Sequence, residues 1–208
     1  GLINKSIDAG YKVMIVIAGV YSSLRRQTQE RCDEGVIGRT TNSFMSKNNI
    51  VGVGNYASNN DPEIYSFTTS NYTGVTDDGD FNADRVKGLN IPIGSSPIIL
   101  VIKKNKSILE NIIRFFSEKL DEDKEKLINL PTLIIDDEAD NASVNTSRSL
   151  DEAKTINRLI RTLINLFDQS TYIGYTATPY ANLFIPDSDK ELTTRIGDSP
   201  YDYKIGPD

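Results

Sequence analysis

The fold of this chain is indicated most strongly by the stretch Leu133-Ile134-Ile135-Asp136-Asp137-Glu138-Ala139-Asp140, in which a short apolar run leads directly into acidic residues. Buried strands of parallel sheets are short apolar runs, and the active sites of open α/β sheets lie outside the carboxyl ends of their strands. The stretch therefore predicts a buried strand whose end carries carboxylates to the rim of a sheet.

The segments on either side follow the alternation of strand and helix that is typical of an α/β fold with right-handed crossovers. Apolar runs predict strands, and apolar residues at helical spacing predict helices. Ser107-x-x-Glu110 and Ser149-x-x-Glu152 have the spacing of capping boxes at helix starts. We expect strands at 11–18, 98–102, after Pro131 and at 172–175, and helices at 1–9, from Ser22 or Ser23 to near Gly35, and after each capping box. Short strand-like pieces at Ile50–Val53 and Ile64–Thr68 indicate an inserted hairpin or an irregular loop region.

A second motif follows the last predicted strand, where Thr176-Ala177-Thr178 precedes Pro179. D-E-A-D at Asp137–Asp140 and T-A-T at Thr176–Thr178 together resemble the Walker B motif and motif III of helicase superfamily 2, a group of nucleic-acid-dependent ATPases. Val13 to Ala18, Leu24 and Gln27-Thr28 look like motif Ia of these enzymes. The resemblance implies a three-layer RecA-like parallel sheet, with helices on both faces.

A longer pattern narrows the resemblance. The segments Asp136–Ser143 and Gly174–Asn182 are similar to the Z-one domain family, whose members are labelled endonucleases and are linked to bacterial DNA-modification and defence gene clusters. The region from Thr40 to Pro97 matches this family least clearly.

The resemblance also implies roles for individual side chains, with ATP and Mg²⁺ as cofactors. Asp137 would help to hold Mg²⁺ through a water molecule, and Glu138 would position and activate the attacking water. Asp140 would hydrogen-bond toward Thr176 or Thr178 and couple the nucleotide site to movement of the lobe. Such a site is chemically sufficient, because Mg²⁺ takes few carboxylates and keeps several waters. The same acids could instead cap a helix or lie in a solvated loop.

Nucleic acid, DNA rather than RNA, is the expected partner. Arg25, Gln27 and Thr28 lie on the helix after the first strand and are candidates for contact with a nucleic-acid backbone, although a charged helix face is usually only solvated. Lys103 and Lys104 directly follow a predicted strand, where they could contact phosphate.

One element of the ATPase pattern is missing. A P-loop has the form G-x-x-x-x-G-K-S/T, and this sequence contains none. We therefore expect residues 1–185 to form an incomplete RecA-like lobe, with an irregular insertion at about 40–97, and residues 186–208 to be a linker toward a second domain. Without a P-loop strand beside it, the strand at Tyr172 to Thr176 should be an exposed edge, and this chain alone should not turn over ATP.

The composition restricts the alternatives. The chain has 208 residues, 38% of them hydrophobic, a single cysteine, no histidine and a formal net charge of -6. The absence of histidine excludes Ser-His-Asp or Cys-His catalysis and histidine-ligated metal sites within this sequence. The lone Cys32 suits a reducing compartment, so a cytoplasmic protein is expected, and no apolar run is long enough for a membrane span.

An alternative function remains open, namely an endonuclease or an endonuclease-associated DNA-binding module without ATP turnover. Metal-dependent nucleases gather carboxylates, often with a lysine, around one or two metal ions. The E-x-K pattern that we considered for such a site is Glu122-x-Lys124, which lies in an uninterrupted charged segment typical of an exposed helix end or loop.

Overall fold

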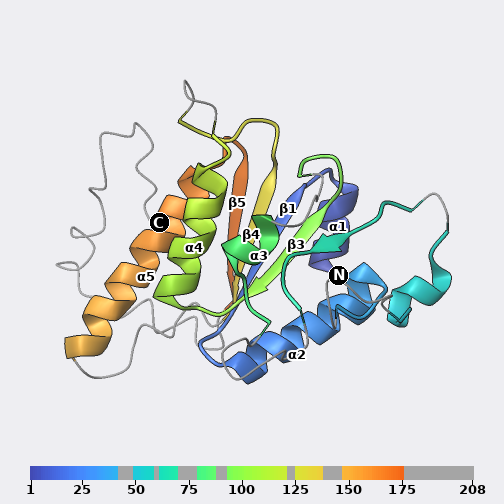
Figure 1. The fold of residues 1–208 in the computed structure, drawn as a ribbon, viewed down its shortest axis with the longest axis horizontal. Coiled ribbons are helices and arrows are strands. Elements are labelled where there is room, and N and C mark those ends of the chain that lie inside the picture. Colours follow the sequence, from blue (N-terminus) through green and yellow to red (C-terminus); the bar gives the residue numbers. More distant parts are fainter. Residues whose placement is uncertain are drawn as a thin grey trace.

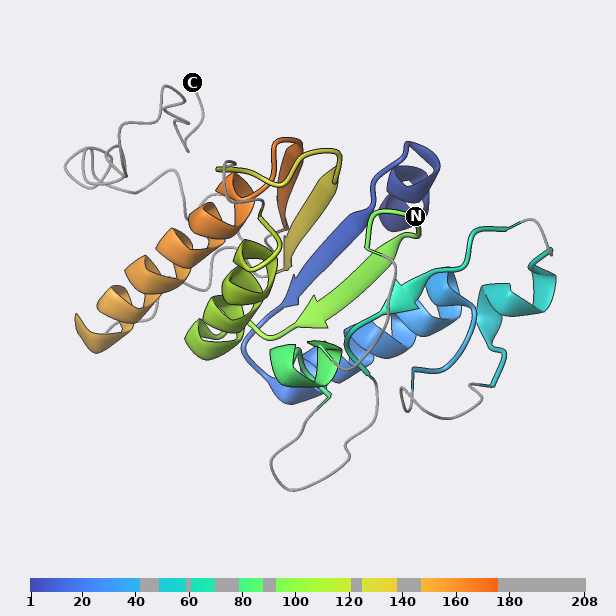
Figure 2. The same ribbon diagram turned by 45° about the horizontal axis from the view of Figure 1, so that its top comes forward.

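The computed structural model describes residues 1–41, 49–58, 61–69, 79–87, 93–120, 125–137 and 147–175. In this part of the chain, five strands form one parallel sheet in the order β2-β3-β1-β4-β5 (Figures 1 and 2). The predicted α/β class and parallel sheet are confirmed. The strands are β1 (Val13–Ala18), β2 (Tyr65–Ser66), β3 (Ile98–Ile102), β4 (Thr132–Asp137) and β5 (Ser170–Tyr175).

Helices cover both faces of the sheet, as predicted. Side chains alternate between the two faces along β1, which is why every residue of this strand is buried. Val13, Ile15 and Ile17 pack in the same apolar cluster as α3, α4 and α5, whereas Met14 and Val16 pack with α1 and the end of α2. The α-helices are α1 (Leu2–Asp8), α2 (Ser22–Cys32), α3 (Ala83–Lys87), α4 (Lys106–Ser117) and α5 (Ser147–Asn165), and a π-helix, η1 (Asp33–Ile37), continues α2.

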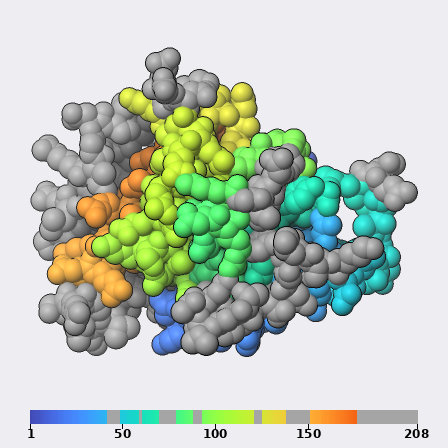
Figure 3. Space-filling model, viewed as in Figure 1, coloured from blue at the N-terminus to red at the C-terminus, as the bar shows by residue number. Residues whose placement is uncertain are grey.

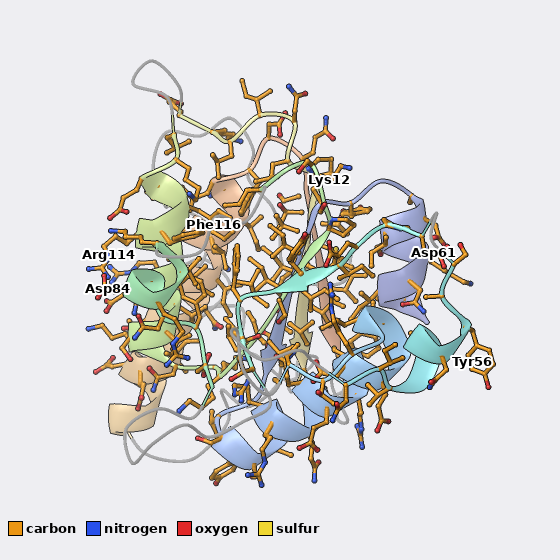
Figure 4. The ribbon with its side chains drawn as sticks, turned by 45° about the vertical axis from the view of Figure 1, so that its right-hand side comes forward. Lys12, Tyr56, Asp61, Asp84, Arg114 and Phe116 are labelled. Atoms are coloured by element: carbon orange, nitrogen blue, oxygen red, sulfur yellow. The ribbon has the colours of Figure 1, made fainter. Side chains whose placement is uncertain are left out.

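Helix α4 shows how the larger apolar cluster is built. Its buried residues, which include Ile112 and Phe116, recur at helical spacing and form the face directed at the sheet (Figure 4). The ring of Phe116 meets that of Phe167 edge to face, with centroids 5.1 Å apart. The helix start differs from the prediction, because the cap is Asn105 and not Ser107. The carboxamide of Asn105 accepts a hydrogen bond from the backbone N–H of Ser107 at 2.9 Å.

Some of the described residues between α2 and β3 have regular structure. The strand predicted at Ile64–Thr68 is present as β2, but Ile50–Val53 does not form one. Ile50 makes an isolated antiparallel bridge, and the chain then turns into a 3₁₀-helix, η2 (Gly52–Tyr56), because Gly52 has a left-handed backbone with φ of 49°. The region around η2 forms the right-hand end of the molecule in Figure 3.

Candidate functional site at the ends of the parallel strands

Asp137 lies at the carboxyl end of the sheet. It is the last residue of β4 and is exposed, and its Cα is in register with Ala18 of β1 and Tyr175 of β5. β4 and β5 therefore end at the same rim, and D-E-A-D and T-A-T begin there in the chain. The other predicted catalytic and coupling residues, namely Glu138, Asp140, Thr176 and Thr178, lie outside the described residues.

Asp136 is a buried acid that sequence reasoning left without a role. It is 1% exposed. Because side chains alternate along a strand, Asp136 lies on the face of Ile134, which packs with α4 and α5, while Asp137 is directed to the other face.

Lys104 is the ion-pair partner of Asp136. Its Nζ lies 3.0 Å from Asp136 Oδ2, and the two side chains are only 8% and 2% exposed. Lys104 follows β3, which is separated from β4 by β1, so its side chain crosses the carboxyl end of β1. The structure gives no support to the predicted contact between Lys104 and nucleic-acid phosphate, because its ammonium is paired with Asp136 and largely buried.

Tyr172 of β5 completes the cluster. Its hydroxyl donates a hydrogen bond to Asp136 Oδ2 at 2.9 Å. Burial raises the pKa of the Asp136 carboxyl above its ordinary value, and the Lys104 charge and both hydrogen bonds oppose this increase. Burial, and then the Asp136 charge, raise the pKa of Tyr172, so its hydroxyl stays protonated and donates. Asp136 Oδ1 is buried without a hydrogen-bond partner among the described residues.

Arg25 lies inside the protein and not on a nucleic-acid surface. Its side chain is 0% exposed, and its guanidinium donates to the backbone carbonyls of Thr69 at 2.8 Å and Val101 at 3.4 Å. This burial gives no support to the prediction that Arg25 contacts nucleic acid. The next residue, Arg26, is exposed instead.

The remaining candidates for nucleic-acid contact are accessible. Gln27 is exposed, whereas Thr28 and Lys103 are partly exposed. Lys103 Nζ donates to Ser22 Oγ at 3.3 Å, so the loop after β3 meets the start of α2. These two segments border the same rim of the sheet as Asp137, because they follow β3 and β1 directly.

Sequence reasoning also missed a buried polar network beneath α2. Gln29 donates to Asp33 Oδ1 at 3.0 Å and accepts from the hydroxyl of Thr68 at 2.7 Å. Thr68 Oγ1 in turn accepts from the backbone N–H of Val101 in β3. A signal was present, since Arg25, Gln29 and Asp33 recur every four residues on one helix face. A helix face with polar residues at this spacing is ordinarily exposed to solvent, however. The pattern therefore predicts that this face of α2 is exposed, whereas in the structure it is buried.

The part of the chain that the structure describes contains no group of three or more cysteine, aspartate or glutamate side chains placed to hold a metal ion. Asp137 alone still fits Mg²⁺, because this ion is commonly held by one or two carboxylates together with substrate phosphates.

Cys32 is buried, and burial raises the pKa of its thiol to about 12, so it stays protonated and unreactive near neutral pH. No helix in the described ranges combines the length and apolar character needed to cross a membrane.

Comparisons with known proteins do not add to this picture. No protein-family model matches the chain, and a search of curated proteins gave no match either. The assignment of a function therefore rests on the motifs of the sequence and on the arrangement of the strand ends.

Proposed function

We propose that this chain forms part of the RecA-like lobe of a nucleic-acid-dependent ATPase similar to helicase superfamily 2, nearest to the Z-one domain family. One observation carries the proposal. Asp137 is exposed at the carboxyl end of a parallel strand, and its register partner Tyr175 immediately precedes T-A-T. The strand ends from which the two motifs continue thus lie side by side, which supports a site shared between them.

The strand order supports the same proposal. β1, β4 and β5 are consecutive in the sheet, and these are the strands that lead into the motif Ia-like segment, D-E-A-D and T-A-T. The carboxyl ends of the three strands consequently lie at one rim of the sheet. A nucleotide at D-E-A-D and a nucleic acid near the loop after β1 would then occupy neighbouring sites.

The chemistry assigned to the chain is limited to its own residues. Mg²⁺ and ATP, when bound, supply the reactive phosphoryl group and neutralise part of its charge. Asp137 would hold the metal through a water, and Glu138 would orient the attacking water and accept its proton. Asp140, with Thr176 and Thr178, would link this site to movement of the lobe.

Contact with nucleic acid is assigned to accessible residues only. Gln27, Thr28 and Lys103 are the predicted contacts that remain exposed or partly exposed. A net charge of -6 gives no general attraction to phosphate, so binding should be local and dependent on salt. We favour DNA as the partner, in a bacterial DNA-modification or defence system.

The proposal is tested by magnesium-dependent ATP hydrolysis in the full-length protein, with and without single- and double-stranded DNA and RNA. Glu138→Gln removes the group that accepts the proton, so turnover should fall by at least about 100-fold. Glu110→Gln is the matched control, because this exposed glutamate of α4 has only a 3.7 Å contact with Lys106, and turnover should not change.

Three results would contradict parts of the proposed function. Equal turnover in wild type and Glu138→Gln would remove Glu138 from catalysis. Absence of turnover in the full-length wild-type protein under every condition would refute the ATPase proposal and favour a DNA-binding module. Hydrolysis by residues 1–208 alone, lost in Glu138→Gln, would show that this chain contains its own phosphate-binding element.

A further inference from the structure

The Lys104–Asp136–Tyr172 cluster, named from its three side chains, connects strands that are not all neighbours. Tyr172 reaches Asp136 from the adjacent strand β5, but Lys104 comes from beyond β3 and passes the end of β1. One carboxylate oxygen thus receives donors from both sides of β4. This links the ends of β3, β4 and β5.

The loop between β3 and α4, residues 103–105, is held along its length. The backbone N–H of Lys103 donates to Asp80 Oδ2 at 3.0 Å, and that of Lys104 donates to the carbonyl of Gly19, just after β1, at 2.6 Å. The Lys104 ammonium then joins this loop to β4. The loop is consequently placed relative to the acidic end of β4, two strands away.

Stability alone does not account for this arrangement. A buried ion pair loses its hydration, and well-packed apolar residues of similar volume often serve as well or better. Asp136 Oδ1 also lies buried without a partner among the described residues, which adds to the cost. Its position immediately before Asp137 suggests a role in placing the acids that follow.

We infer that Asp136 is a positioning residue that, through Lys104, fixes the loop of residues 103–105 relative to Asp137 at the end of β4. The effect of this contact on ATP hydrolysis rests on the proposed function. A nucleic-acid phosphate that contacts this loop, where Lys103 is partly exposed, would shift the loop and thereby the acidic run. Nucleic acid would then control hydrolysis through a defined mechanical contact.

The physical link is tested by hydrogen exchange on residues 1–208, without any ligand. Lys104→Met removes the charge but keeps a long unbranched side chain. Exchange should become about 5-fold faster both in the loop at 103–105 and at the end of β4 at 135–137, because the net effect of one hydrogen bond is lost at both places. Lys104→Arg should restore slow exchange at 135–137.

Two further variants keep this test interpretable. Lys87→Met breaks an ion pair with Glu118 that is exposed on the surface, and it should leave exchange at 135–137 unchanged. Tyr172→Phe removes a single hydroxyl from the cluster and should accelerate exchange at 135–137 even where Lys104→Met fails to fold. Faster exchange confined to residues 103–105 in Lys104→Met, or no change at 135–137 in Tyr172→Phe, overturns the inference.

The functional consequence is tested in the full-length protein. Lys104→Met should reduce nucleic-acid-stimulated kcat by about 5-fold, the lower end of typical coupling between sites, with the KM for ATP unchanged. Lys104→Arg should recover the stimulation, which a general loss of folding would not allow. A decrease in kcat together with a change in the KM for ATP would contradict the positioning role of Asp136 and Lys104. Failure of Lys104→Arg to recover the stimulation would contradict it as well. Absence of wild-type turnover refutes the proposed function, while the exchange experiment still decides the link between loop and strand.

Discussion

Asp136 and Asp137 are adjacent in the chain but occupy different environments. Asp137 is exposed at the rim, whereas Asp136 is buried and paired with Lys104. Strand alternation separates them, because successive side chains of a strand point to opposite faces. Asp136 and Asp137 therefore lie in two different environments, and the role of each must be argued separately.

Arg25 and Arg26 give the sharpest test at the scale of single residues. Arg25→Ala leaves the carbonyls of Thr69 and Val101 without their buried donor, so the free energy of unfolding should fall by about 3 kcal/mol. Arg26→Ala is the matched control, because Arg26 is exposed, and its effect should stay within about 0.5 kcal/mol. Urea denaturation monitored by circular dichroism measures both.

The same two variants separate a structural from a binding role. If Arg25→Ala were as stable as wild type but bound DNA more weakly, the burial of Arg25 would be wrong and the nucleic-acid assignment would return. Fluorescence anisotropy with a labelled oligonucleotide gives this second measurement.

Among the structural elements, η2 shows how a local turn depends on close contact between two glycines, one within η2 and one at the end of η1. Gly54 packs directly on Gly38, and a Cβ added at Gly54 would lie 1.8 Å from the carbonyl oxygen of Gly38. Backbone atoms cannot move aside as a flexible side chain can. Gly38 itself has φ of 79°, a left-handed conformation that favours glycine at the end of η1.

Gly54→Ala should accordingly lower the free energy of unfolding by roughly 1–3 kcal/mol, the usual cost of forcing atoms into a closely packed place. Gly35→Ala is the control, since its Cβ would meet nothing within 4 Å. The control should leave stability unchanged or raise it by up to about 1 kcal/mol, because alanine restricts the unfolded chain. Thermal and urea unfolding of the two variants decide the matter, and equal effects would contradict the close approach of η2 to Gly38.

At the scale of the whole molecule, β5 forms one edge of the sheet in the described residues, and it pairs only with β4 there. Its side chains are partly or fully exposed, including Tyr172 at 40% and Tyr175 at 50%. Unpaired strand edges with apolar side chains template association with other chains. The sequence-based expectation of an exposed edge therefore agrees with the place of β5 in this sheet.

We predict that residues 1–208 associate through this edge as their concentration rises. Tyr175→Lys places a charge on the edge and should weaken association, whereas Tyr56→Lys, the same change at a residue 90% exposed on η2 and far from the sheet, should not (Figure 4). Sedimentation velocity at several concentrations measures the effect. A stable wild-type monomer with strong protection of residues 170–175 from hydrogen exchange would contradict the prediction.

Much of the architecture could be predicted because each element has a local signature. The apolar runs of β1, β3 and β4 and the apolar stripe of α4 identify buried elements without knowledge of their neighbours. Predictions failed where a local pattern had two structural meanings. The strand expected at Ile50–Val53 was lost to the left-handed turn at Gly52, and the expected cap Ser107 was replaced by Asn105.

The amino-acid sequence by itself determined the class of this protein, the parallel strands and the acidic run at the end of β4, because hydrophobic periodicity and motif spacing are properties of neighbouring residues. Only the tertiary structure decided that the side chains of Arg25 and Lys104 are buried and that Asp136 joins Lys104 to Tyr172. The physical reason is that the burial of a charge depends on partners distant in the chain: Asp136 is 32 residues from Lys104 and 36 from Tyr172.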